Sequence, residues 1–485
     1  MTSFTEDQLD GPINEVLARV MSTALKEPNI FWQKHSYAQK LSDLCIDLFN
    51  RDSECETIDN DSGRYCSSYP HTIVIPIKSK GARNNFVDSG EGLEDNKSYQ
   101  KLFDDVVTSG RFGRARCRFP VPVIEIFGKY VCRSSTLSSG KEIVAQTTVN
   151  KLKSFFGFGH ESAKKEISLS KAETNEISNS LSYYDQLVSS YRQLDIKLLT
   201  SFGISDIFDL MVENKKVKYG LYVSSSEKID REDRYKNFSL NVIPYPGCEF
   251  FTEYSENQRN DKDLYFDWEQ NGVNTLLNVT NPILNGIDFS LYKSWDLNEI
   301  TKNYLLILLN RIKDSSNGLL IHCISGWDRT PMFISLLRLS LWADGLIHES
   351  LSVCEIVFLT TVYDWLMFSH NFKNRFSKRE EIMYYCFATL EAVAEEKFSL
   401  ISDDFQRIMP SLSNYSCSFC CGQSVFSNQQ SVKIIRNNLI KTAQKNCCVH
   451  ERASNRQEAL LLRKKRLLNA GKLFISAYES LGKLN

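Results

Sequence analysis

One short stretch constrains this chain more than any other: an apolar strand that ends in a cysteine, a tight loop, and a helix that begins at an arginine. Residues 318–322 (GLLIH) are typical of a buried strand, and Cys323 follows directly. Five residues separate Cys323 from Arg329, Pro331 suits the first turn of a helix, and Gly345 is placed to end it. A strand and a helix joined in this way are typical of a layered α/β fold.

The order of residues in this loop suits the transfer of a phosphoryl group. Backbone N–H groups of a tight loop at a helix N-terminus bind phosphate oxygens, and Gly326 lets the loop curl without a Cβ clash. Arg329 can hold two oxygens with its planar guanidinium. The same positive groups lower the pKa of Cys323, so its thiolate can attack phosphorus and form a phosphocysteine that water hydrolyses. Thr330 can donate a hydrogen bond to the departing sulfur, and the scheme requires no metal ion or other cofactor.

A plain structural alternative is that Cys323 is a buried core thiol and Arg329 caps a helix. Cysteine and arginine six positions apart are common by chance. An apolar strand, His-Cys, five residues, Arg-Thr and an apolar helix form a much rarer combination. The motif therefore favours a catalytic cysteine.

The rest of the chain divides into regions of different pattern. From about residue 200, short β-branched runs alternate with helical or loop segments, which predicts an α/β sheet with crossovers. Before it, helical periodicity over 1–50 and a hairpin over 116–133 that turns near Gly128 predict an N-terminal α+β extension. We divide the chain into an N-terminal α+β region (1–140), a linker or insertion (141–185), a catalytic domain (186–400), a cysteine-containing loop region (401–455) and a C-terminal amphipathic helix (456–485).

The residues from Cys323 to Thr330, CISGWDRT, resemble the signature C-x-x-G-W-D-R-T of the myotubularin phosphoinositide 3-phosphatases. The segments FISLLRLSLWADGLIH, VENKKVKYGLYVSSSEK and IPYPGCEFF are similar to one divergent branch of that family, and the resemblance runs from about residue 63 to 400. It implies a protein-tyrosine-phosphatase-like fold with a central, mostly parallel sheet flanked by helices. It also implies hydrolysis of phosphatidylinositol 3-phosphate and phosphatidylinositol 3,5-bisphosphate at endosomal and autophagic membranes.

The same resemblance implies which residues form the site. It places the general acid that protonates the leaving inositol oxygen at Asp328, while Glu249, after the strand that ends in IPY, and Asp296 remain alternatives. Trp327 either stacks on the inositol ring or packs behind the loop. The remaining expected substrate contacts also come from the loop: Ile324, Ser325, Gly326 and Thr330.

Two features depart from the family pattern. Most myotubularins carry an acidic residue where this chain has Ser325, which puts one contribution to substrate choice in doubt. The typical family member also has an N-terminal lipid-binding domain and a C-terminal coiled coil. Here we find no sustained heptad repeat, and residues 1–140 form either a degenerate version of that domain or another extension.

Composition indicates where such a protein works. The formal net charge is −1, so no whole-molecule field draws it to nucleic acid or an anionic membrane. The N-terminal residues contain no apolar run, no segment is long enough to cross a bilayer, and the 14 cysteines without a secretory signal indicate a reducing compartment. We expect a cytoplasmic protein that contacts phosphoinositide membranes transiently and from outside. Its protein partners are unknown.

Three further segments invite a functional interpretation. Arg114, Arg116 and Arg118 alternate as on a strand face and would meet acidic headgroups or, more simply, solvent. Lys215, Lys216 and Lys218 would flank the pocket. Residues 152–159, with three phenylalanines near lysines, form either a membrane-inserting loop or a loop packed on its own domain.

Cysteines near the C-terminus raise the question of zinc. Cys417, Cys420 and Cys421 fit one half of a zinc site, and Cys447, Cys448 and His450 could supply the other half. This second half lacks standard spacing, so ordinary thiols are favoured. The basic run 463–466 is expected on the solvent face of a helix packed against the catalytic domain. Two rivals to a lipid phosphatase remain: a protein-tyrosine phosphatase with the same chemistry, and a lipid-binding scaffold without turnover.

Overall fold

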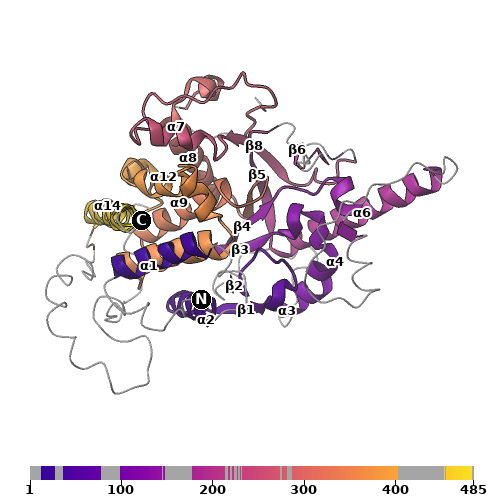
Figure 1. The fold of residues 1–485 in the computed structure, drawn as a ribbon, viewed down its shortest axis with the longest axis horizontal. Helices are drawn as coiled ribbons and strands as arrows, with labels where there is room; N and C mark the ends of the chain where they lie inside the picture. Colours follow the sequence, from indigo (N-terminus) through magenta and orange to yellow (C-terminus); the bar gives the residue numbers. More distant parts are fainter. Residues whose placement is uncertain are drawn as a thin grey trace, which may run out of the picture.

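A computed structural model provides the structure of this chain (Figure 1). The part of the chain that the structure describes comprises residues 13–27, 36–77, 99–144, 146–147, 177–213, 217–218, 221–222, 227, 230, 232–273, 276–280, 287–401, 453 and 455–482.

A five-stranded sheet forms the centre of the molecule. Its strands lie in the order β3 (Val121–Ile126), β4 (Lys129–Ser135), β9 (Gly318–Cys323), β5 (Ile204–Met211) and β8 (Ser239–Tyr245). β3 and β4 are antiparallel, and every other neighbouring pair is parallel. This arrangement confirms the predicted mostly parallel sheet. The expected turn of the hairpin also forms, with Phe127 and Gly128 both at positive φ (52° and 74°).

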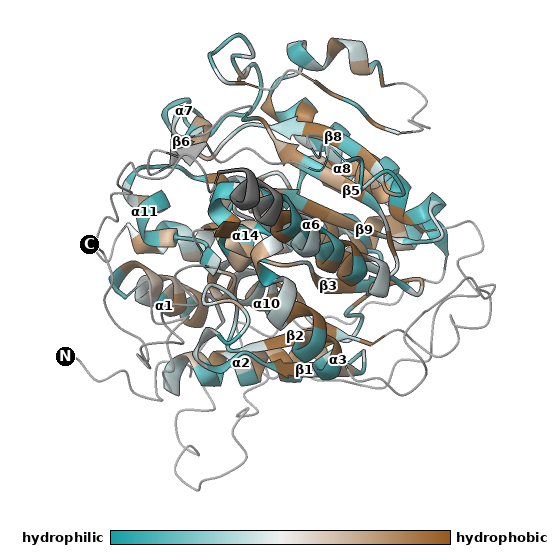
Figure 2. Ribbon diagram, turned by 90° about the vertical axis from the view of Figure 1, so that its right-hand side faces the viewer, coloured by the Kyte–Doolittle hydropathy of each residue, from teal (hydrophilic) through white to brown (hydrophobic). Residues whose placement is uncertain are grey.

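Helices cover both faces of this sheet (Figure 1). α9 (Arg329–Ala343) follows β9 after the loop and is buried along its whole length. It packs against the sheet and against α8 (Leu297–Asp314) and α12 (Ile382–Ala388). α6 (Ile177–Ser201) lies on the other side with α4 (Thr108–Gly110). Because the strands are covered on both faces, they read as continuous apolar runs, and Figure 2 shows the central strands mainly in the hydrophobic colour.

The N-terminal region is built onto this same body. α1 (Ile13–Lys26) packs against α14 (Arg456–Leu481), and α2 (Ser36–Phe49) precedes a two-stranded antiparallel sheet of β1 (Cys55–Asp59) and β2 (Thr72–Pro76). β3 and β4, which belong to the region 1–140 of the sequence prediction, lie in the central sheet beside β9. The division proposed near residue 140 therefore does not separate two sheets.

The expected C-terminal helix is observed as α14. Gly471 lets it approach α12 closely, because a Cβ there would lie 2.8 Å from the carbonyl oxygen of Phe387. The rings of Phe387 and Phe474 stack with centroids 3.8 Å apart. Of the run 463–466, Lys464 and Lys465 are exposed as predicted. Arg463 is fully buried instead, where it donates to Asp344 and to the carbonyl oxygen of Ser340.

Two features of the described residues bear on membranes and metals. None of the helices described is both long and apolar enough to cross a bilayer. Among the side chains placed by the structure, no three from His, Cys, Asp and Glu lie together as a metal site requires. The candidate zinc cysteines, the phenylalanines of 152–159, and the side chains of Lys215, Lys216 and Lys218 lie outside the described part.

Candidate active site

The loop between β9 and α9 rests on the neighbouring strand β4. Gly326 adopts the left-handed conformation (φ 66°), and a Cβ at this position would lie 2.6 Å from the carbonyl oxygen of Ser134. A larger residue would therefore be strained by its backbone angle and by this contact. The glycine that the motif analysis singled out is required by the geometry of the loop.

Cys323 lies at the end of β9 with its sulfur turned into the loop. The thiol is 2% exposed, and its sulfur accepts hydrogen bonds from the backbone N–H of Gly326 and from the hydroxyl of Thr330, each at 3.2 Å. Burial opposes ionisation, but the positive charge of Arg329 and the hydrogen bonds from Thr330 outweigh it, so the pKa of Cys323 lies below its ordinary value. This arrangement stabilises a thiolate, the reactive form of cysteine.

Arg329 is held at the start of α9 by a carboxylate that the sequence analysis missed. Its two terminal nitrogens donate to the two carboxylate oxygens of Glu213, each at 2.8 Å. One of them also donates to the carbonyl oxygens of Leu210 and Tyr245, both at 3.2 Å. The guanidinium is thereby fixed between the ends of β5 and β8. The available signal was positional: Glu213 is an acid just beyond the carboxyl end of a parallel strand, where ligands bind in such sheets.

Asp328, the predicted general acid, forms ion pairs within the protein. Its carboxylate accepts from Nε and Nη2 of Arg375 at 3.1 and 2.8 Å, and Nδ1 of His370 lies 3.0 Å from Oδ1. Burial raises the pKa of Asp328, but the charge of Arg375 and the contact with His370 prevail and hold it far below its usual range. Asp328 is therefore ionised in this arrangement, and its role as an acid stays a prediction. No motif pointed to His370 or Arg375.

The two alternative acids have different surroundings. A Cβ at Gly247 would lie 2.6 Å from a carboxylate oxygen of Glu249 and 3.9 Å from one of Glu213, which places Glu249 close to the group that holds Arg329. Asp296 instead caps α8: its carboxylate accepts from the backbone N–H of Glu299 at 2.8 Å and from that of Asp263 at 3.1 Å. Of these two, only Glu249 lies near the arginine.

Two buried arginines hold the loop from behind. The carbonyl oxygen of Gly326 accepts from Arg118 and from Arg133, each at 3.1 Å. This carbonyl therefore points away from Cys323, while the N–H of the same residue points to the sulfur. Burial and the neighbouring Arg118 lower the pKa of Arg133 to about 10, so it stays charged at neutral pH.

The prediction of a strand face shared by three arginines is wrong. Residues 114–118 form two successive tight turns, closed by hydrogen bonds from the N–H of Cys117 to Arg114 and from the N–H of Arg118 to Ala115, with Arg116 and Cys117 at positive φ (57° and 59°). Arg114 and Arg118 are each 1% exposed, so neither can meet a headgroup. Only Arg116 is half-buried, and its guanidinium lies 4.8 Å from the centre of the Trp327 ring.

The other loop residues differ in exposure. Ile324 is buried, whereas Ser325 and Trp327 are half-buried. The ring of Trp327 lies against Arg116, and its carbonyl oxygen lies 3.1 Å from Nδ1 of His370. These contacts favour a packing role for Trp327, and its expected contact with inositol stays a prediction.

A buried charge network lies behind the nucleophile. His322, next to Cys323, is fully buried, with Nε2 3.1 Å from a carboxylate oxygen of Glu227 and Nδ1 3.8 Å from one of Asp209. Burial lowers the pKa of His322, but the two carboxylates outweigh it and raise the pKa. Glu227 also accepts from Arg114 at 2.6 Å, and Arg114 forms a two-bond ion pair with Asp195. The network joins β9 to α6 and so fixes the strand that carries Cys323.

Comparison with known proteins finds similar chains in human and mouse. No family model matches the chain. It is 41% identical over 378 residues to the human phosphatidylinositol-3,5-bisphosphate 3-phosphatase MTMR14, covering 77% of this chain and 56% of that protein. Against the mouse protein of the same name the identity is 40% over 390 residues, covering 80% of this chain and 58% of that protein. The chain thus spans little more than half the length of these relatives.

Proposed function

Over its matched residues this chain belongs to the myotubularin-related phosphoinositide 3-phosphatases, and from this premise we propose that it removes the 3-phosphate of phosphatidylinositol 3-phosphate and phosphatidylinositol 3,5-bisphosphate. The observation that carries the proposal is the pair of hydrogen bonds that Gly326 and Thr330 donate to the sulfur of Cys323, which with the charge of Arg329 favour the thiolate form of this cysteine.

The reaction follows from these positions. The thiolate of Cys323 attacks phosphorus in line, the inositol oxygen leaves, and a phosphocysteine forms. Backbone N–H groups of the loop and the guanidinium of Arg329 stabilise the charge on the phosphoryl oxygens. Water then attacks phosphorus and releases inorganic phosphate, while Thr330 donates to the departing sulfur. Apart from the attacking water, the chain's own residues supply every group that these reaction steps use.

The leaving inositol oxygen needs a proton, which we assign to Asp328. In the structure this carboxylate is bound to Arg375, so it must take up a proton when the negatively charged substrate enters. Glu249 is the alternative, because it lies near Glu213 and Arg329. Comparing the hydrolysis of one lipid by Asp328→Asn and by Glu249→Gln separates the two candidates. Replacing the true acid removes the dependence of the hydrolysis rate on protonation of that carboxyl group, whereas the other variant keeps this dependence.

We further propose that the protein is cytoplasmic and acts transiently at endosomal or autophagic membranes. This placement follows from the substrate, which is a lipid of a bilayer. A protein-tyrosine phosphatase remains the second candidate, because the thiolate and arginine would serve a phosphotyrosine equally well.

The test is phosphate release from vesicles containing each phosphoinositide and from phosphotyrosine peptides, with EDTA present. We expect release only from the 3-phosphorylated lipids, reduced at least ~10³-fold in Cys323→Ser. Release mainly from peptides would keep the mechanism and overturn the substrate. If well-folded protein releases phosphate from neither, the chain is a scaffold. Trapping a phosphocysteine in a single turnover distinguishes that case independently.

A further inference from the structure

Exposed cations gather on α11 (Phe372–Ser377) and directly after it, beside the phosphate-binding loop. Lys373, Lys378 and Arg379 are all exposed. Arg375 of the same helix faces inward, where it donates to Asp328. Lys373 lies two positions from Arg375 and so projects from a different side of the helix. We call these three exposed cations the α11 edge.

The acidic residues of this segment face the interior instead. Glu380 and Glu381 are only 5% and 8% exposed. Glu380 accepts from Arg375, and Glu381 accepts from Arg259 at 2.8 and 2.9 Å. Lys378 has one long contact with Glu380, at 3.9 Å, and its side chain remains 57% exposed. The negative charges are therefore used inside the protein, and the surface of the segment is positive.

Packing, a helix cap and an ion pair hold α11, and so the three exposed cations, in place. Its inner side packs on α14, where the ring of Tyr478 lies 5.9 Å from Phe372 and 5.6 Å from Phe376, measured between ring centres. The side chain of Asn371 accepts from the backbone N–H of Asn374 and so caps the helix. The ion pair between Arg375 and Asp328 ties the helix to the catalytic loop. A surface that binds the α11 edge thus also orients the loop.

The α11 edge lies on the side of the molecule toward which the parallel strands of the central sheet run. Figure 2 shows α7 (Phe250–Glu256), β6 (Val217–Lys218) and α11 along one side. α7 follows β8 and β6 follows β5, so this is the side at which the parallel strands end, and β9 ends there too, at Cys323. A flat partner against α11 would face the phosphate-binding loop.

We propose that the α11 edge docks on an anionic lipid bilayer and turns the catalytic loop toward the headgroups. This inference rests on the proposed function, because a 3-phosphorylated lipid reaches Cys323 only if the loop faces the membrane. One cation beside an anionic membrane strengthens binding about five-fold, so three contribute roughly 100-fold. The other class of partner, an acidic protein, is an outcome of the test.

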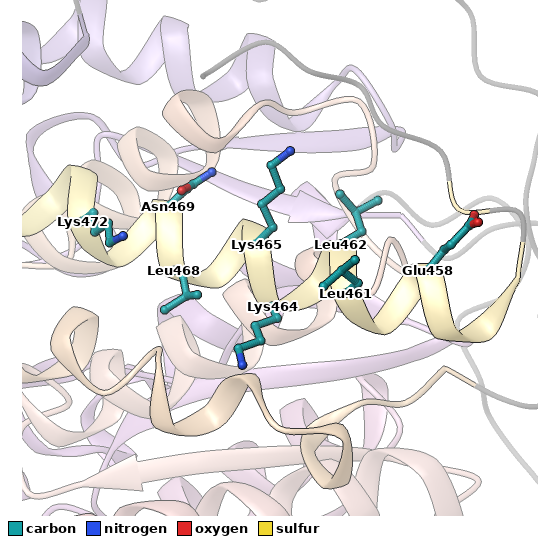
Figure 3. A pocket seen from close by; sticks show the side chains of 8 residues that line it. All are labelled: Glu458, Leu461, Leu462, Lys464, Lys465, Leu468, Asn469 and Lys472. Carbon is teal, nitrogen blue, oxygen red and sulfur yellow. The ribbon is translucent and has the colours of Figure 1, made fainter. Parts of the chain in front are cut away.

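The test uses the whole 485-residue chain and two matched variants. The first neutralises the α11 edge: Lys373→Gln, Lys378→Gln and Arg379→Gln. The second neutralises three exposed lysines of α14, Lys464, Lys465 and Lys472, which are among the residues that line a pocket along this helix (Figure 3). Of these lysines, Lys464 and Lys465 directly follow Arg463, which contacts Asp344 at the far end of α9, about 20 Å along that helix from Arg329.

Binding is measured by co-sedimentation with phosphatidylcholine vesicles, with and without phosphatidylserine and free of phosphoinositide. Hydrolysis is measured on vesicle-bound and on short-chain, water-soluble phosphatidylinositol 3-phosphate. We expect the α11 variant to bind phosphatidylserine vesicles about 100-fold more weakly and to lose vesicle hydrolysis accordingly. It should keep the unaltered rate on the soluble substrate, and the α14 variant should match the unaltered protein throughout.

Unchanged vesicle binding in the α11 variant would overturn the proposal and make an acidic protein the candidate partner. An equal loss of hydrolysis on soluble and vesicle substrate would also overturn it, since the edge would then serve the chemistry. An equal loss of binding in the α14 variant would show that charge at any place suffices. If the unaltered protein binds vesicles through the α11 edge but hydrolyses neither substrate, docking stands and the proposed function fails.

Discussion

At the scale of single residues, Glu213 offers a sharp test of how the site is built. Its two carboxylate oxygens bind both terminal nitrogens of Arg329. Replacing Glu213 by Gln leaves one acceptor, frees the guanidinium to rotate, and should lower kcat/KM by about 100-fold on 3-phosphorylated lipid. Glu213→Asp, which keeps the charge on a shorter side chain, should recover part of the loss. Steady-state kinetics of both variants provide the measurement, and equal activities for Gln and the unaltered protein would exclude the positioning role.

The hydroxyl of Thr330 gives a prediction about pH. It donates to the sulfur of Cys323 and helps to lower the pKa of that thiol. Without it the pKa rises, so less thiolate is present at low pH, and the difference between the two proteins disappears once the pH exceeds both pKa values. Alkylation of Cys323 in Thr330→Val should therefore be about ten-fold slower at pH 6 and nearly unchanged at pH 9.

Several other cysteines of the described residues are less reactive than Cys323. Burial raises the pKa of Cys45 and of Cys386, so these thiols react slowly across the same range. Mass spectrometry of the modified peptide identifies Cys323 directly. Equal slowing at both pH values would mean that the substitution blocks access to the sulfur and does not act through its ionisation.

The same scale shows which site residues a sequence can reveal. Cys323, Gly326 and Thr330 lie within eight positions of one another, so the contacts among them follow from one local pattern. Glu213 lies 116 positions from Arg329, and Arg133 lies 193 positions from Gly326. Only the order of the strands brings these residues together, and no local pattern carries it.

At the scale of elements, the connection from β9 to α9 depends on the backbone of Gly326. Gly326→Ala should abolish most activity, because its Cβ would press on the carbonyl oxygen of Ser134 in β4 and displace the loop. The left-handed conformation alone costs an alanine about 1–2 kcal/mol. Gly345, at the other end of α9 and also left-handed (φ 73°), is the matched control. Gly345→Ala should lower the unfolding temperature but keep kcat, and equal kinetic losses in both variants would contradict a specific role for the loop.

Helices and strands were predictable where the periodicity of the apolar residues and the turn residues next to them in the chain indicate the same element. The hairpin of β3 and β4 follows from two apolar runs around Phe127 and Gly128. Residues 114–118 misled the prediction because alternating arginines imitate a strand face. Tertiary contacts override that pattern: Arg114 pairs with the buried carboxylates of Asp195 and Glu227, whereas Arg118 donates to buried carbonyl oxygens. The backbone between the two arginines turns, with Arg116 and Cys117 at positive φ. A pattern of charges cannot show that the charges will be buried.

At the scale of the whole molecule, the first and last helices of the described residues pack together on the helices that flank the central sheet. α1 and α14 pack together, and α14 also contacts α9, α10 (Val353–Leu359) and α12. The central sheet itself joins β3 and β4 to strands that come far later in the chain. The family resemblance predicted the type of fold. It did not predict how the first and last helices pack together or which strands become neighbours, because these contacts join residues separated by hundreds of positions.

A buried ion pair joins α14 to the end of α9, and it gives a prediction about stability. Arg463 of α14 and Asp344 at the end of α9 are both fully buried and lie 2.6 Å apart. Replacing Arg463 by Met leaves Asp344 without its cation, at a cost of about 3–5 kcal/mol in the free energy of unfolding near pH 8. Burial already raises the pKa of Asp344 despite the charge of Arg463, and removing that charge raises it further.

The sign of the pH dependence follows from this direction. A carboxyl group with a raised folded pKa is stabilised by protonation, so the loss in Arg463→Met should shrink as the pH falls from 8 toward 5, whereas a cavity or packing defect would cost the same at both values. Chemical denaturation at the two pH values measures the difference. The double variant Arg463→Met with Asp344→Asn, which removes the unpaired charge, should recover much of the lost stability at pH 8 and show little dependence on pH. Because Asp344 lies at the opposite end of α9 from Arg329, kcat of the folded variants should stay unchanged. A loss of kcat without a loss of stability would show instead that α14 acts on the site and does not simply close the fold.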